Sequence, residues 1–137
     1  MDLRPGDIVV VDASVMITRE GGRKVVKKLE ESQACLAVCD KLLDEYRENV
    51  RYASGMSPLV FEWHRLGPLK EKGLYRHVRD KDMLRVVPEQ EEDSHIGNLA
   101  ATVGAKVIVM RNKKSAPTLR QTYGLPVVSL KEFLDCM

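Results

Sequence analysis

The sequence predicts an α/β fold, in which helices cover the faces of a central, mainly parallel sheet of four to five strands. Two observations support this prediction. Short apolar runs rich in Val and Ile alternate with longer segments of helical periodicity along the chain. The run "IVVV" at 8–11 is apolar without interruption, as is typical of a strand buried on both faces. The chain has 137 residues, the size of one ordinary domain, so we expect residues 1–137 to form a single domain.

The strands are predicted from short runs of β-branched and apolar residues, at 7–12, 34–38, 84–88, 106–110 and 126–129. Between and after them, helical periodicity predicts helices at about 22–31, 40–52, 93–103, 115–123 and 129–135. Asp40 is the expected N-cap of the second helix. Segment 56–79 is less regular, and we expect one or two further helices there, broken near Gly67 and Gly73.

Composition excludes several classes of protein. No apolar stretch approaches the roughly 18 residues of a membrane span, and the N-terminus is acidic where a signal peptide is basic, so we expect a cytoplasmic protein. Cys35, Cys39 and Cys136 lack the spacing of zinc ligands and are expected to be reduced thiols. The net charge of +2 is too small to indicate nucleic-acid binding. The basic residues of 65–85 could bind RNA or a partner protein, or could equally well be a solvated surface.

Acidic residues follow three of the predicted strands. Asp12 closes the first strand, the range 40–45 follows the second, and the range 89–93 follows the third. The fourth strand leads into the basic range 111–114 instead. Because ligands of open parallel sheets bind at the carboxyl ends of the strands, these segments are the candidate site.

Helical phase selects which acids face that site. On the helix at 40–52, Glu45 lies on the flank of the apolar stripe, whereas Asp44 and Glu48 point away from it. Asp93 lies one turn ahead of the stripe of the helix at 93–103, and Glu92 competes with it for an inward role. Simpler interpretations stay open: Asp12 as a turn cap, Glu45 as an ordinary flank residue and Asp93 as a helix cap.

Three carboxylates at one place repel one another unless a cation neutralises them. Asp12, Glu45 and Asp93 offer only oxygen atoms, the ligands that suit Mg²⁺ or Mn²⁺. Such an ion can activate a water molecule and offset the charge of a phosphodiester. His95 has no second histidine at ligand spacing, so we expect it at the surface or in support of a ligand. The chain lacks the glycine-rich loops of nucleotide-binding domains and the acid pair with lysine of a phospho-receiver.

Four stretches in order carry a resemblance to a known family. They are "VVVDASVMI", "CDKLLDEYRENV", "EDSHIGNLAATVGAKVIVM" and "GLPVVSLKEFL". Together they resemble the PIN domain, a three-layer α/β sandwich of metal-dependent ribonucleases that includes toxins of toxin–antitoxin pairs. The resemblance implies that Asp12, Glu45 and Asp93 are the catalytic, metal-holding acids and that Ser14 supports them.

The resemblance has one departure. Where the family usually carries Thr-x-Asp after the fourth strand, this chain has Met110, Arg111 and Asn112, so Asn112 replaces a fourth acid. An amide keeps an oxygen atom but removes a charge, and metal affinity should fall.

Two functions are therefore expected. The first is a Mg²⁺- or Mn²⁺-dependent endoribonuclease, in which Arg111, Lys113 and Lys114 contact RNA phosphate. The second is a catalytically weakened module that binds RNA or a protein. The sequence does not identify the RNA target. An antitoxin or other protein partner is possible, and so is a homodimer.

Overall fold

The computed structural model describes residues 2–86, 93–111 and 116–135. Its centre is a five-stranded sheet in which every neighbouring pair of strands is parallel, in the order β3-β2-β1-β4-β5. The strands are β1 (Ile8–Val11), β2 (Cys35–Cys39), β3 (Tyr75–Val78), β4 (Val107–Val109) and β5 (Val127–Val128). The predicted fold class, a mainly parallel sheet of four to five strands between helices, is confirmed.

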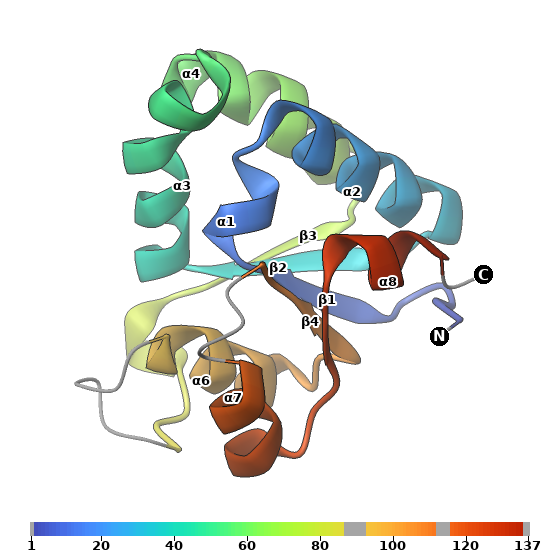
Figure 1. Cartoon of the computed structure of the whole chain (residues 1–137), viewed down its shortest axis with the longest axis vertical. Helices are drawn as coiled ribbons and strands as arrows, with labels where there is room; N and C mark the ends of the chain where they lie inside the picture. The colour runs from blue at the N-terminus through green and yellow to red at the C-terminus, as the bar shows by residue number, and fades with distance from the viewer. Residues whose placement is uncertain (1, 87–92, 112–115, 136–137) are drawn as a thin grey trace.

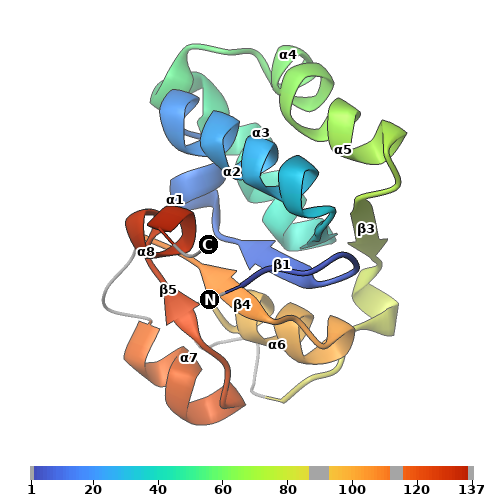
Figure 2. The ribbon, with the colours of Figure 1, turned by 90° about the vertical axis from the view of Figure 1, so that its right-hand side faces the viewer.

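Helices cover both faces of the sheet, which gives three layers (Figures 1 and 2). On one face lie the helices that follow the first two strands and the one that ends the described chain, namely α1 (Ala13–Met16), α2 (Arg19–Ser32), α3 (Asp40–Ser54) and α8 (Leu130–Asp135). On the other face lie α6 (Ser94–Val103) and α7 (Ala116–Tyr123). A helical arm precedes β3 and consists of α4 (Pro58–Phe61), the π-helical turn η1 (Glu62–Leu66) and α5 (Gly67–Glu71).

The central strands are buried on both faces, as their uninterrupted apolar sequences predict. Val9, Val10 and Val11 of β1 and all three residues of β4 have no exposed surface. The core is mainly aliphatic because the chain is poor in aromatic residues. Cys35 and Cys39 of β2 are free thiols, and burial raises the pKa of both. Cys136 lies outside the described residues.

The strand predicted at 84–88 is wrong, because the third strand of the sheet is β3 at 75–78. Residues 84–86 run beside α6, where Leu84 N donates to Thr102 Oγ1 (2.8 Å) and Val86 N donates to Asn98 Oδ1 (2.9 Å). Helix side chains thus satisfy the backbone N–H groups that a neighbouring strand would otherwise bind. Residues 87 and 88 lie outside the described ranges.

The expected N-cap role of Asp40 is also wrong. The N-cap of α3 is Cys39, and Asp40 is the first residue of the helix. Its carboxylate instead accepts a hydrogen bond from the backbone N of Asp80 (3.1 Å) and lies 2.6 Å from His77 Nε2. Asp40 therefore joins the start of α3 to β3 and to the short 3-10 turn η2 (Asp80–Asp82).

Within the three described ranges, no helix is both long enough and apolar enough to cross a membrane.

Candidate functional site

Asp12 lies at the carboxyl end of β1, in the middle of the sheet. Its backbone N donates to Val109 O (2.8 Å), which continues the pairing with β4 one residue beyond the strand. The side chain is only 8% exposed and is the N-cap of α1, accepting hydrogen bonds from Ser14 Oγ (2.5 Å) and Ser14 N (3.3 Å). Asp12 does cap the next turn, as the simpler interpretation expected. Both of these bonds go to Oδ2.

Ser14 connects the ends of the two central strands. While its Oγ donates to Asp12, the same atom accepts a hydrogen bond from Arg111 N (3.2 Å), directly after β4. Ser14 therefore fixes the orientation of the Asp12 carboxylate relative to the strand end at Arg111. The resemblance to the PIN domain implies a supporting role for Ser14, which stays a prediction. The side chain of Arg111 is exposed.

Glu45 reaches the same end of the sheet from α3. Its neighbour Tyr46 is completely buried and donates its hydroxyl to Val11 O (2.5 Å), which holds α3 against the end of β1. The Glu45 side chain is 32% exposed, whereas that of Asp44 is 65% exposed. Glu48 is exposed as well. The helical phase predicted from the sequence is thus the one that the structure has.

His95 of α6 contacts Glu45 directly. Its Nε2 lies 2.5 Å from Glu45 Oε1, and only 8% of its side chain is exposed. Among the described residues, His95 Nδ1 has no hydrogen-bond partner, and the atom is buried. Because a carboxylate oxygen accepts, Nε2 is the donor in this hydrogen bond. Of the two expectations for His95, the surface position is wrong, whereas the contact with Glu45 fits the alternative that His95 supports a candidate ligand.

Asp93 precedes α6 in a left-handed backbone conformation, with φ of 60°. Although it occupies the N-cap position, its side chain makes no capping hydrogen bond. The interpretation of Asp93 as a simple helix cap therefore finds no support in the hydrogen bonds. Positive φ is uncommon for residues other than glycine, although aspartate tolerates it, and such conformations concentrate at functional sites. Its rival Glu92 lies outside the described residues.

The three acids interact electrostatically. Burial raises the pKa of Asp12, the hydrogen bond from Ser14 opposes that effect, and the negative charges of Asp93 and Glu45 raise the pKa further. Burial and the charges of Asp12 and Glu45, among others, also raise the pKa of Tyr46 well above its ordinary value. Among the residues that the structure describes, none forms an ion pair with Asp12. The end of β1 is therefore a buried, negatively charged position.

The fit of this site to a metal ion is partial. Within ranges 2–86, 93–111 and 116–135, no three His, Cys, Asp or Glu side chains are close enough together to hold one. His95 occupies one oxygen atom of Glu45. Mg²⁺, however, usually keeps several water molecules and is held by one or two carboxylates. Asp12 and Asp93 are two carboxylates and therefore supply the type and number of ligands that such an ion needs.

Three predicted residues, Asn112, Lys113 and Lys114, lie outside the described residues. Comparison with known proteins adds no family to this description: no family model matches the chain, and no curated protein matches it.

Proposed function

We propose that the protein is a Mg²⁺- or Mn²⁺-dependent endoribonuclease of the PIN type, with its site at the carboxyl end of β1. The observation that carries the proposal is the buried carboxylate of Asp12, whose pKa is raised by burial and by the charges of Asp93 and Glu45. A fold gains nothing from gathering like charges, whereas a cation site requires them. The four sequence stretches that resemble the PIN domain support the same function.

Each side chain would have a separate role. Asp12 and Asp93 would hold the ion, and Ser14 would keep the Asp12 carboxylate in its orientation. Glu45, held by His95, would accept a hydrogen bond from a coordinated water molecule. When bound, the ion would supply that water as the nucleophile and offset charge on the phosphodiester. Arg111, Lys113 and Lys114 would contact the RNA backbone.

Two observations favour a second function, a weakened module that binds RNA or a protein. Glu45 is engaged by His95, and the described residues hold no group of three metal ligands. Asn112 in place of a fourth acid would lower metal affinity, which favours the same second function. An antitoxin-like partner or a second copy of the chain would then be the object of binding.

The decisive experiment is cleavage of labelled single-stranded RNA by the purified protein with Mn²⁺, with Mg²⁺ and with chelator. We expect cleavage with metal only, and a rate at least about tenfold lower for Glu45→Gln, since even groups that support metal ligands matter this much. Glu48→Gln is the matched control, because Glu48 is exposed on the same helix. Equal loss in both variants, or cleavage that survives chelation, contradicts the proposal.

The binding-module function predicts a different result. The wild-type protein would cleave no RNA with either metal, yet it would bind RNA with an affinity that falls as salt rises. Replacing Lys113 and Lys114 with Ala would then weaken binding about equally across RNA sequences and flatten the salt dependence. An unchanged salt dependence would make the lysine pair ordinary surface.

A further inference from the structure

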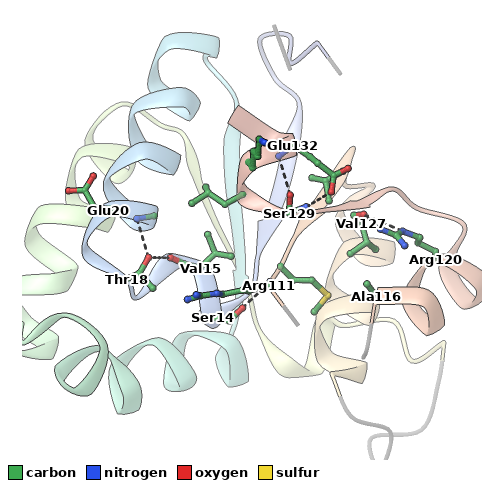
Figure 3. A pocket seen from close by; sticks show the side chains of 15 residues that line it. Ser14, Val15, Thr18, Glu20, Arg111, Ala116, Arg120, Val127, Ser129 and Glu132 are labelled. Carbon is green, nitrogen blue, oxygen red and sulfur yellow. Dashed lines mark hydrogen bonds between the residues drawn. The ribbon is translucent and has the colours of Figure 1, made fainter. Parts of the chain in front are cut away.

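A cavity of about 800 Å³ lies beside the candidate site (Figure 3). Its walls come from α1 and the start of α2, from the end of β4, and from α7, β5 and α8. Ser14 belongs to this lining and also donates a hydrogen bond to Asp12. The cavity is therefore separated from the buried carboxylate by one side chain.

The topology of the sheet explains why a cavity forms here. The chain passes from β1 to β2 on one side and later returns to place β4 on the other side of β1. The strand after β1 thus lies on one side and the strand after β4 on the other, and open α/β sheets bind ligands at such a switch point. Ser14 follows β1 and Arg111 follows β4, and both line the cavity. Its size lies within the roughly 300–1,000 Å³ of typical ligand sites.

Aliphatic side chains form much of the lining, including Val15, Met110, Val127 and Leu130. These side chains can make van der Waals contact with a flat, weakly polar group, but they cannot form hydrogen bonds with it.

Several polar groups of the lining are already paired with one another. Thr18 Oγ1 donates to Val15 O (2.8 Å) and accepts from Gly21 N (3.1 Å). Arg120 donates twice to Val127 O, at 2.6 and 3.2 Å.

Ser129 and Glu132 exchange two hydrogen bonds of 3.1 Å at the start of α8. These pairs leave fewer groups able to bind the polar edges of a ligand, with the exposed Arg111 and Lys131 among them.

Arg111 supplies positive charge where the cavity meets the candidate site. Figure 3 shows it beside Ser14. Its side chain is exposed, and a guanidinium binds phosphate with two parallel hydrogen bonds. A phosphate bound there would lie between the apolar lining and the acids.

We propose that this cavity binds one unstacked base of single-stranded RNA, with the adjoining phosphate at Arg111, and that it accepts all four bases. This inference rests on the proposed ribonuclease function and names the form of its substrate. Apolar contact with a base is available to every base, whereas selection among bases needs free hydrogen-bonding groups. A base inside a duplex is paired and stacked, and removing it costs free energy, so duplex RNA is a poorer ligand.

Binding measured in chelator tests the inference without cleavage. Fluorescence anisotropy would compare a labelled twelve-residue RNA with the same strand carrying abasic sites and with its duplex. We expect abasic RNA and duplex RNA to bind at least about tenfold more weakly than the intact single strand. Strands of the four bases should agree within about fivefold. Equal binding of abasic and intact RNA overturns the inference, and so does strong preference for one base.

Filling the cavity should have the same effect as removing the bases. Val128 is half-buried in the lining, and Val128→Phe should weaken binding of intact RNA about tenfold while leaving abasic RNA unaffected. Val60→Phe is the matched control, since Val60 is 42% exposed on α4 and lies outside the lining. Leu130→Phe is a second variant in case Val128→Phe fails to fold. Unchanged binding by a folded cavity variant contradicts the inference.

The two proposals fail in different ways. If the ribonuclease function is wrong but the cavity takes a base, intact single strands bind better than abasic ones and no metal produces cleavage. If the cavity takes no base but the ribonuclease function is right, metal-dependent cleavage proceeds while intact and abasic strands bind equally.

Discussion

Two strands of the sheet end in the same way and create opposite environments. After β1 the chain continues with Asp12, and after β2 it continues with Asp40, each following an apolar run and beginning a helical segment. The pKa of Asp12 is raised, first by burial and further by the charges of Asp93 and Glu45. The pKa of Asp40 is lowered, first by the hydrogen bond to His77 and then by the bond from Asp80 N.

The difference comes from what each carboxylate faces. Asp40 is exposed beside β3 at the edge of the sheet, where a histidine and a backbone N–H stabilise its charge. Asp12 is buried at the central strand, where only Ser14 donates to it in the described part of the chain. An aspartate after an apolar strand is therefore no functional signal by itself. The signal is a carboxylate whose charge the fold leaves poorly compensated.

The largest expected effect separates these two aspartates by activity. Asp12→Asn should lower metal-dependent RNA cleavage by at least about 100-fold, because it removes a ligand charge and not merely a group that supports one. The fold should persist, since an amide oxygen can still accept the hydrogen bond from Ser14. Initial rates with Mn²⁺ and circular dichroism measure the two outcomes.

Asp40→Asn is the matched control for that experiment. It removes the same charge after a neighbouring strand but lies in the contact between α3 and β3. Cleavage should change less than about twofold, as expected for a surface substitution remote from the chemistry. A large loss of activity in Asp40→Asn would mean that the acidic site extends to the edge of the sheet.

A smaller effect tests packing instead of charge at the same end of the sheet. A Cβ atom added at Gly97 of α6 would lie 2.0 Å from the ring of Tyr123 on α7, so Gly97→Ala forces that ring to move. We expect the free energy of unfolding to fall by about 1–3 kcal/mol, the usual cost of overpacking. Urea denaturation measures it, and the loss should be the same at pH 7 and pH 5 because no charge changes.

Gly67→Ala is the control for the glycine substitution. Its added Cβ would lie 3.5 Å from Glu62 O, an ordinary contact, within a helix. Stability should stay the same or rise by up to about 1 kcal/mol, because alanine reduces the freedom of the unfolded chain. If both variants lose stability alike, the ring of Tyr123 is not the cause.

Most of the fold follows from sequence patterns, and the wrongly placed third strand has a physical cause. The strands at 8–11, 35–39, 107–109 and 127–128 were predicted because buried parallel strands are continuous apolar runs. The edge strand β3 has the sequence "YRHV", with Arg76 and His77 exposed, so it lacks that signature. Leu84 and Val86 have an apolar, strand-like sequence, but their backbone N–H groups bond to side chains of α6.

The site was predictable only where helical phase applies. The inward direction of Glu45 followed from the stripe of α3, but its partner His95 did not follow from any spacing motif. The composition of α6 held a clue: "SHIGNLAATV" carries no Asp, Glu, Lys or Arg, as expected of a helix buried nearly all round. The pairing itself depends on how α6 and α3 approach one another, which a single sequence does not encode locally.

The next prediction extends the comparison to the end of β4. If Asn112 replaces a fourth carboxylate, Asn112→Asp should tighten Mn²⁺ binding by about one order of magnitude, since ligand charge tunes such affinities over decades. Cleavage should rise in parallel. Isothermal calorimetry of both proteins measures the affinity, and Asn112→Ser controls for loss of the amide alone. An affinity unchanged or lowered by the added carboxylate means that residue 112 points away from the acids.

The smallest effect is the pH dependence of stability, and here the two aspartates should move in opposite directions. Both start from an ordinary pKa of 3.8. Because the folded pKa of Asp12 is raised, its ionisation costs the fold stability as pH rises through that pKa. Asp12→Asn should therefore be more stable than wild type at pH 7, in chelator, and the gain should shrink as the pH falls towards 4.

Asp40 has the reverse sign, because its folded pKa is lowered. Its contribution is present above 3.8 and is lost only as the pH falls through the still lower folded value. Asp40→Asn should be less stable than wild type at pH 7, and most of the loss should persist as the pH falls towards 4, because the carboxylate keeps its charge above its lowered pKa. Urea denaturation of both variants at pH 7, 5.5 and 4 measures the difference. If the free energy of unfolding changes with pH in the same way for both variants, the two strand ends affect the pKa of their aspartates alike. That result would contradict the assignment of Asp12 to a cation site.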